Sequence, residues 1–368
     1  MVIRPIQHQD LHVLRAIARE SGPGFTSLVD DPHVLKRKIA HSVASFDRAA
    51  AAPAGEHYLF ILEDDDTGQV MGTTGIEASA GHERPLFHFR CTAAQSRPDQ
   101  TRASDWLTRC NHYTGCSEIC SLYLRPAYRG AGHRKAHAGR LLSKVRFLFM
   151  AQHPLRFAQT VIAEMRGVSD AQGQSPFWDS LKSHAGNLDF ATVTQLAGMG
   201  NSALLNTLLP EEPIATASLS ERAREVIGQV HEQTRPALKL LLEEGFRHTG
   251  FVDLFDAGPT VEAPRGDIAS VRQSAPCQVQ VVDDNVLTIT RNQQALLLAN
   301  TGISDFRATV TKAATWLPHR QVLAIPRSLA ARLKLETGSP ARFLPLAQAT
   351  GRGIADAGPT TTEARYAY

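Results

Sequence analysis

Residues 116–150 read CSEICSLYLRPAYRGAGHRKAHAGRLLSKVRFLFM and decide the class of fold. The run EICSLYL predicts a strand, and residues 139–153 carry apolar side chains at helical spacing. The basic turn between them contains glycines. A strand that leads through such a turn into a long helix is a common phosphate-binding arrangement, because the first helical amides are unpaired and the helix dipole favours an anion. The alternative is a solvated basic loop.

The flanking sequence predicts an α/β fold. Strand patterns occupy residues 1–7, 57–64, 70–79 and 160–168, and helical patterns occupy residues 8–21, 31–46, 175–184 and 234–246. Ser175 and Pro176 are the expected N-cap and first residue of one helix. This order of elements favours a mixed sheet with helices on both faces.

The pattern of residues changes near Pro264. Residues 1–265 form the predicted α/β core, and residues 266–348 are rich in short β-prone runs and turns. Residues 349–368 lack a core pattern, so we expect a disordered tail there.

Composition excludes several classes of protein. The 368 residues are 43% hydrophobic and 20% charged, and 39 basic against 36 acidic residues give a net charge of +3. That balance argues against a nucleic-acid partner. The sequence has no apolar run of about 18 residues and no signal-peptide pattern at its start, so we expect a cytoplasmic protein without a membrane span.

The five cysteines are expected to be reduced thiols, because their number is odd and no leader is recognised. The stretch CNHYTGCSEIC offers Cys110, His112, Cys116 and Cys120 as an alternative zinc site. It lacks the paired C-x2-C spacing of structural zinc sites, so the sequence favours no metal.

Several longer blocks resemble the arginine N-succinyltransferase family, within the GNAT-type acyltransferases. They include YLFILEDDDTGQVMGTTGIEA, TGCSEICSLYLRPAYR, AEMRGVSDAQGQSPFW, EVIGQVHEQTRPALKLLLEEGFR and FDAGPTVEAP, and they follow the family order over residues 1–265. The turn around Gly130–Gly139 is longer than the family pattern, with His137 in place of a glycine. The resemblance implies a GNAT-type core, succinyl-CoA and L-arginine as substrates, no further cofactor, and an oligomer of one chain or with a related subunit.

Two site residues follow from the resemblance. His231, in IGQVHEQTRPA, matches the family histidine proposed as a proton donor, although a histidine before a helix is often only structural. A helix N-terminus disfavours imidazolium, so whether His231 acts as acid or base stays open. Leu122 matches a succinyl-CoA contact made through the backbone, and strand alternation places it on the same face as Glu118 and Cys120.

Further candidates follow from the chemistry of the substrates. Arg129, Arg134 and Lys135, with the amides near Gly139, suit the pyrophosphate of CoA. A guanidinium substrate needs carboxylates, and Glu118, Glu164 and Asp253 are candidates. Arg166 suits a substrate carboxylate, or it pairs with Glu164 as a structural residue.

The sequence therefore predicts an arginine N-succinyltransferase that produces N2-succinyl-L-arginine in arginine catabolism. The alternatives are a related CoA-dependent N-acyltransferase acting on ornithine or another amine, and a non-catalytic subunit that binds CoA.

Overall fold

The computed structural model describes residues 1–22, 24–92, 105–130, 137–170, 172–184, 186–201, 209–286 and 294–346. Arg134, Lys135 and the predicted tail 349–368 lie outside these residues. No helix in the described ranges is long and apolar enough to cross a membrane.

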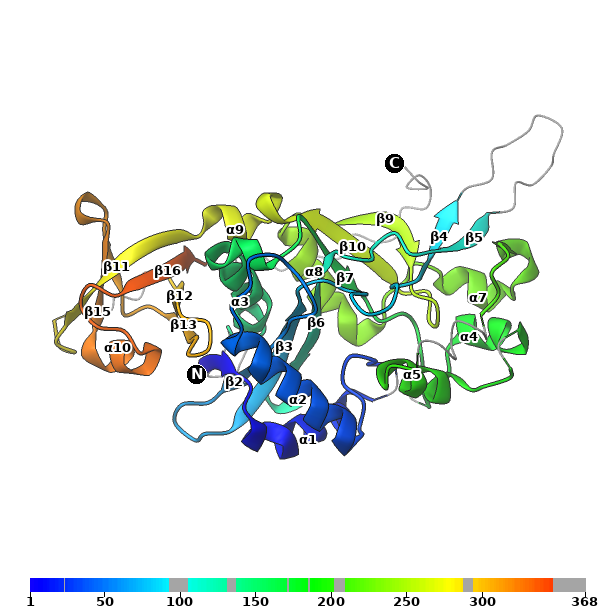
Figure 1. The fold of residues 1–368 in the computed structure, drawn as a ribbon, viewed down its shortest axis with the longest axis horizontal. Helices are drawn as coiled ribbons and strands as arrows, with labels where there is room; N and C mark the ends of the chain where they lie inside the picture. Colours follow the sequence, from blue (N-terminus) through cyan, green and yellow to red (C-terminus); the bar gives the residue numbers. More distant parts are fainter. Residues whose placement is uncertain are drawn as a thin grey trace.

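The described strands form one mixed sheet of 16 strands (Figure 1). In chain order they are β1 Val2–Pro5, β2 His57–Glu63, β3 Val70–Glu77, β4 His88–Thr92, β5 Trp106–Cys110, β6 Ser117–Leu124, β7 Thr160–Glu164, β8 Ile214–Ala215, β9 Arg247–Val252, β10 Pro259–Pro264, β11 Ala275–Val282, β12 Leu296–Asn300, β13 Ala308–Thr311, β14 Thr315–Leu317, β15 Val322–Pro326 and β16 Pro340–Pro345. Their order across the sheet is β14-β15-β11-β16-β12-β13-β1-β2-β3-β6-β7-β10-β9-β4-β5-β8.

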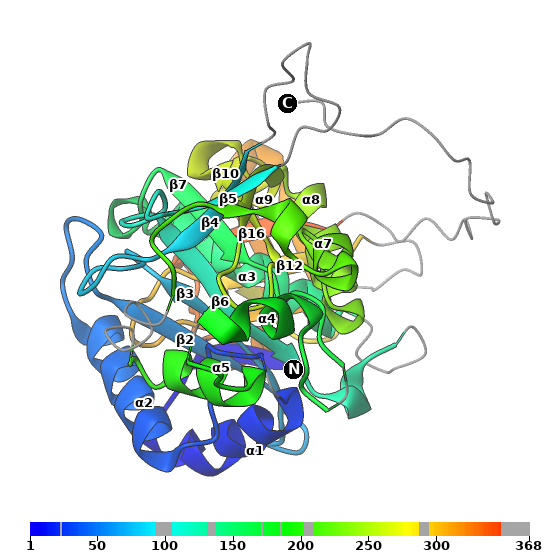
Figure 2. The ribbon, with the colours of Figure 1, turned by 90° about the vertical axis from the view of Figure 1, so that its right-hand side faces the viewer.

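Helices pack on both faces of the central strands (Figures 1 and 2). The described α-helices are α1 Leu11–Ser21, α2 Pro32–Asp47, α3 Ala138–Gln152, α4 Pro176–Leu181, α5 Phe190–Gly198, α7 Glu221–Val226, α8 Arg235–Glu243, α9 Ala269–Gln273 and α10 Arg327–Leu333. Helix α3 shares its apolar cluster with Ile76 and Ile119, whereas α1 and the first half of α2 pack with Leu59 and Ile61 on the opposite face. The α/β class and the helices on both faces are confirmed.

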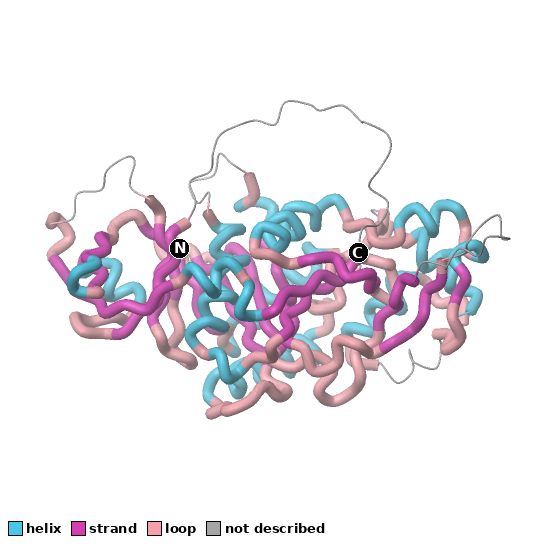
Figure 3. Tube along the Cα trace, turned by 90° about the horizontal axis from the view of Figure 1, so that it is seen from above, coloured by secondary structure: helices cyan, strands magenta, loops and turns pink. Residues whose placement is uncertain are grey.

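The C-terminal strands continue the same sheet at one end of the elongated molecule (Figures 1 and 3). β13 pairs with β1 through Ala308 and Ile3. Phe306 packs in the cluster that holds Phe60 and Phe149. The C-terminal region therefore shares part of its core with the N-terminal region.

Local differences from the sequence patterns have simple causes. Ser175 caps α4 as predicted, with Pro176 at its first position. Strands β4 and β5, and the separate strand β10, were missed because each is short and follows a polar or turn-rich stretch. Residues 327–333 form a helix within the stretch that reads as β-prone, because tertiary packing outweighs local propensity.

A β-bulge divides β6. Gly75 pairs with Cys120 and Thr73 with Tyr123, so β6 uses one residue more than β3, and Ser121 takes a left-handed conformation with φ of 52°. Leu122 consequently packs with Ile119 against the α3 face, whereas Tyr123 packs on the α1 face. The alternation that placed Leu122 with Glu118 and Cys120 is wrong for this reason.

Candidate active site

A cavity of about 660 Å³ opens where β6 and β7 separate. The two strands pair in parallel at Ser117 with Val161 and at Glu118 with Ile162, and no pairing follows although β6 continues to Leu124. Lining residues come from both faces of the sheet, with Leu142 on the α3 face and Tyr123 on the α1 face. The gap between the strands therefore joins two halves of one cavity.

The half on the α3 face carries cationic and apolar side chains. Gly139, Leu142 and Arg146 line it from α3, at a spacing that puts them on one side of the helix. A Cβ at Gly139 would come no closer than 3.9 Å to Leu124, the nearest of the described side chains, so these residues leave room beside the start of α3. Arg129 also lines the cavity, with its guanidinium 5.0 Å from the centroid of the Tyr123 ring, and its Nε donates to the Leu124 carbonyl at 2.6 Å.

The half on the α1 face is lined by carboxylates. Glu118, Glu164, Asp253 and Asp256 all reach the cavity. Burial, together with the charge of Glu164, raises the pKa of Glu118 well above its usual range. Burial and Glu164 likewise raise the pKa of Asp253. These shifts mark a place where negative charge is concentrated and a cation would be stabilised.

His88 lies against Glu164, one of these four carboxylates. It is fully buried, and its Nε2 lies 2.6 Å from Glu164 Oε1. Burial alone would lower the pKa of His88, but the charges of Glu164 and Asp253 outweigh burial and raise it. His88 therefore holds Glu164 in place while part of the acidic charge remains uncompensated.

Arg166 also lines the carboxylate half of the cavity. Its Nη2 donates to Ser169 Oγ at 3.0 Å, and its Nε is buried without a hydrogen bond. No carboxylate of the described residues lies within ion-pair distance of Arg166, so the structural pairing with Glu164 does not form. Burial lowers the pKa of Arg166.

His231 is tied to the same strand end. Its backbone N–H donates to the Arg166 carbonyl at 2.9 Å, and its Nδ1 accepts from the Gln233 N–H at 3.2 Å. Gln233 and Thr234 line the cavity, and His231 is not among its lining residues. Burial, and then the charge of Arg166, lower the pKa of His231, so the ring is neutral near pH 7. With Nδ1 accepting, the hydrogen of the neutral ring is on Nε2.

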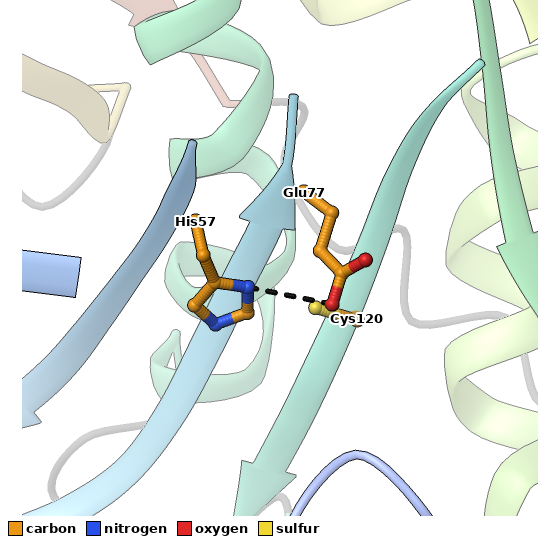
Figure 4. Close-up of side chains that lie close together, drawn as sticks. All are labelled: His57, Glu77 and Cys120. Carbon is orange, nitrogen blue, oxygen red and sulfur yellow. Dashed lines mark ion pairs between the residues drawn. The ribbon is translucent and has the colours of Figure 1, made fainter. Parts of the chain in front are cut away.

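His57, Glu77 and Cys120 form a second cluster on the same sheet (Figure 4). Cys120 also lines the cavity. His57 Nδ1 is 3.5 Å from Glu77 Oε1, and Cys120 Sγ lies near both. Burial, then the charge of Lys38, lower the pKa of His57 to about 4. The stretch 110–120, the alternative zinc site, does not gather its side chains in this way. The His112 ring stacks on the Phe251 ring, with 4.8 Å between the ring centroids. Of its four residues, only Cys120 belongs to a compact group of metal-ligating side chains within the described ranges.

Comparisons with known proteins agree over nearly the whole chain. Residues 1–270 match the family described as the arginine N-succinyltransferase beta subunit, and residues 278–345 match its C-terminal domain. The chain belongs to the arginine N-succinyltransferase family. It is thus a member of an acyltransferase family.

Individual relatives of this family cover the same extent. The chain is 37% identical over 349 residues to arginine N-succinyltransferase subunit beta of Pseudomonas aeruginosa, covering 94% of this chain and 98% of the relative. It is 36% identical over 351 residues to arginine N-succinyltransferase of Yersinia pseudotuberculosis, with the same coverage. A solved structure described as arginine/ornithine succinyltransferase subunit AI from Pseudomonas aeruginosa superposes with a TM-score of 0.82 at 31% identity, covering 94% of this chain and 99% of that one.

The fold brings most of the predicted site residues of this family member to one cavity. Its lining includes Glu118, Leu122, Arg129, Gly139, Glu164, Arg166 and Asp253. Sequence reasoning missed His88, Arg146 and Asp256. His88 begins β4, a short strand that the sequence patterns did not predict, and Arg146 is a charged residue of an amphipathic helix, so no local pattern marks either as buried. Asp256 lies in the block FDAGPTVEAP, and that block was the available signal for it.

Proposed function

We propose that this chain transfers the succinyl group of succinyl-CoA to the α-amino group of L-arginine, giving N2-succinyl-L-arginine and CoA. The observation that carries the proposal is the cavity itself, which joins a cationic, apolar half to a carboxylate-lined half through the gap between β6 and β7. A thioester donor and a cationic amine acceptor can thus approach from opposite faces of the sheet.

The donor fits the half on the α3 face. The N–H groups of Ala138 and Gly139 lie in the first turn of the helix, where no helical carbonyl precedes them, so they suit the pyrophosphate oxygens, and Arg129 adds positive charge to the cavity. The pantetheine arm lies along the unpaired edge of β6, whose backbone donors and acceptors replace a strand partner. In this placement the backbone at Leu122, directly after the bulge, faces the thioester.

The acceptor fits the carboxylate half. The guanidinium of arginine pairs with Glu118 and Asp253, and its α-carboxylate pairs with Arg166. The α-amino group then lies between these two anchors, near the gap in the sheet. This assignment uses charged side chains that form no ion pair within the described residues, although Asp253 accepts from two backbone N–H groups and Arg166 donates to Ser169.

The reaction needs a neutral amine and a protonated leaving thiolate. The amine nitrogen attacks the thioester carbonyl, a C–N bond forms and the C–S bond breaks. A backbone N–H of β6 near Leu122 stabilises the developing oxyanion. The adduct loses a proton from nitrogen, and CoA takes one at sulfur. We assign His231 to this proton transfer, because its neutral ring carries a hydrogen on Nε2 that it can donate.

The first test measures CoA release by the purified wild type and by His231→Ala, with succinyl-CoA and arginine, ornithine or no amine. We expect arginine-dependent release in the wild type and a loss of about 100-fold or more in the variant, with succinyl-CoA binding retained. His248→Ala is the matched control, because His248 is exposed on β9 outside the cavity. Turnover in His231→Ala within about threefold of the wild type would exclude a proton-transfer role.

We further propose that the chain works in an oligomer with a related subunit. The support is the name of the Pseudomonas aeruginosa relative, which is a beta subunit. Light scattering of the purified chain tests this, and a monomer with full arginine-dependent activity would contradict it. The ornithine arm of the first assay tests the second acceptor, which the solved relative's description suggests.

A further inference from the structure

Arg146 is the most deeply buried cation on the wall of the cavity. Its side chain is 2% exposed, and it projects from α3 on the same side as Gly139 and Leu142. It lies seven residues beyond Gly139, so it is about 10 Å further along the helix axis than the phosphate end of the site. Arg146 therefore lies deep in the donor half, where the acyl group of a thioester would be.

Within the described residues, the guanidinium of Arg146 forms hydrogen bonds only to its own helix. Its Nε donates to the Ser143 carbonyl at 3.0 Å and its Nη2 to Ser143 Oγ at 3.3 Å, both one turn earlier in the same helix. No carboxylate of the described residues lies within ion-pair distance of it. Burial lowers the pKa of Arg146 to about 10, so the side chain is still charged at neutral pH.

Glu244 is a carboxylate whose charge acts on Arg146, and it already has partners. Glu244 Oε1 accepts from Lys144 Nζ and Ser270 Oγ, and Glu244 Oε2 accepts from the Ser270 N–H. Other buried arginines are satisfied within the protein. Arg4 pairs with Asp10, and Arg156 donates to Tyr58 and to the Arg48 carbonyl. Arg146 thus differs from both in lacking an anionic or neutral tertiary partner among the described residues.

A buried guanidinium without an anion is costly, and a carboxylate that binds it in two-point geometry removes that cost. We propose that Arg146 binds the distal carboxylate of the acyl group on the CoA donor and so selects dicarboxylic thioesters. This inference rests on the proposed function and adds the residue that distinguishes succinyl-CoA from a neutral acyl-CoA. The cluster of Glu118, Glu164 and Asp253 repels the same carboxylate from the acceptor half, which fixes the orientation of the acyl chain.

The test compares succinyl-CoA with butyryl-CoA, which has the same chain length and a methyl group in place of the carboxylate. For Arg146→Met we expect kcat/KM with succinyl-CoA to fall about 100-fold, as when one side of a buried charge pair is removed. Activity with butyryl-CoA should stay equal or rise. Arg146→Lys retains the charge, so it should keep a reduced preference for succinyl-CoA.

Arg156→Met is the matched control, because it removes a buried arginine that lies outside the cavity lining. We expect its preference between the two donors to equal that of the wild type. A second measurement needs no turnover. Succinyl-CoA should raise the Tm of the wild type more than butyryl-CoA does, and this difference should disappear in Arg146→Met, whereas free CoA should shift both proteins equally.

Two outcomes would overturn the inference. An equal fall of kcat/KM with both donors in Arg146→Met would show that Arg146 has a structural role. An unchanged preference of this variant for succinyl-CoA would show that another group binds the carboxylate. Failure of the proposed function is separate, because a wild type without arginine-dependent turnover can still show the difference in thermal shift.

Discussion

At the scale of single residues, the site is defined by charges that the fold leaves unbalanced. Glu118 and Asp253 are carboxylates whose pKa values burial raises, and Arg146 and Arg166 are guanidinium groups whose pKa values burial lowers. The charged form of each side chain has a higher free energy in the protein without substrates than in water. The opposite charges of an amino-acid acceptor and a dicarboxylic donor would offset this cost.

Glu118→Gln tests the acceptor side. We expect the KM for arginine to rise at least about tenfold, because a charged hydrogen-bonded partner of the guanidinium is lost. The KM for succinyl-CoA should change less than about twofold, since Glu118 faces the other half of the cavity. Steady-state kinetics with each substrate varied in turn would measure both, and an unchanged KM for arginine would contradict the assignment.

The same substitution should stabilise the empty protein at neutral pH. The ordinary pKa of the Glu118 carboxyl is 4.5, and its pKa in the folded protein is higher. As the pH rises above 4.5, the unfolded state loses this proton first, so the folded state is progressively destabilised. Glu118→Gln should therefore raise Tm near pH 7.5 and have no effect near pH 4, as measured by thermal unfolding at both pH values. A Tm gain that is the same at both would exclude this cause.

At the scale of elements, the bulge in β6 is the feature that prepares the cavity. Ser121 has φ of 52°, and its carbonyl accepts a hydrogen bond from Thr73 Oγ1 at 2.8 Å. The extra residue turns Leu122 toward the α3 face beside the open edge of β7. Parallel pairing thus ends where the two substrates are proposed to meet.

Ser121→Val should destabilise the protein by about 1–2 kcal/mol, because a β-branched side chain is strained in the left-handed region. It should also lower kcat by displacing the backbone at Leu122. Ser121→Gly is the matched control, since glycine adopts this conformation without strain. Urea unfolding and kcat would be measured for both variants, and equal behaviour would show that the conformation of the bulge does not matter.

At the scale of the whole molecule, the N-terminal and C-terminal regions are joined by a shared core. We propose that the boundaries between the regions of the chain lie near residues 265 and 348. Leu297 and Phe306 of the C-terminal region are nevertheless buried in one cluster with residues of the N-terminal region. A fragment of residues 1–273 would lose β13, one of the two strands paired with β1, and expose this cluster, so we expect it to aggregate or unfold. Removing only residues 349–368 is the control, with an expected Tm equal to that of the full chain. A soluble 1–273 fragment with the wild-type Tm would show that the first region is independent.

His153 makes the junction of these regions sensitive to acid. Its ring packs on Phe149, and burial, then the charge of Arg156, lower its pKa from 6.5 to about 4. Between pH 6.5 and 4 the unfolded state takes up the proton and the folded state does not, so stability falls as pH falls. We expect His153 to account for about 1–2 kcal/mol of this loss. This is less than the free energy that corresponds to the full pKa shift, because the ring is partly exposed to solvent.

His153→Gln removes this titration. Urea unfolding at pH 4.5 and 7 should therefore show a smaller difference in the free energy of unfolding than in the wild type. Arg342, which also lowers the pKa of His153, should not be altered in the same experiment. An equal loss of stability in the variant would assign the acid sensitivity to other groups.

The sequence by itself determined many of the strands and helices of the N-terminal region, the Ser175 cap and the family, because these depend on local patterns and long matched blocks. It also indicated several cavity residues, since Glu118, Glu164 and Arg166 lie in those blocks. Only the tertiary structure decided which charges remain without partners. His88 compensates Glu164 from a distant strand, Lys144 pairs with Glu244, and Arg146 has no ion-pair partner among the described residues. Burial and pairing depend on contacts between residues far apart in the chain, and no local pattern encodes them.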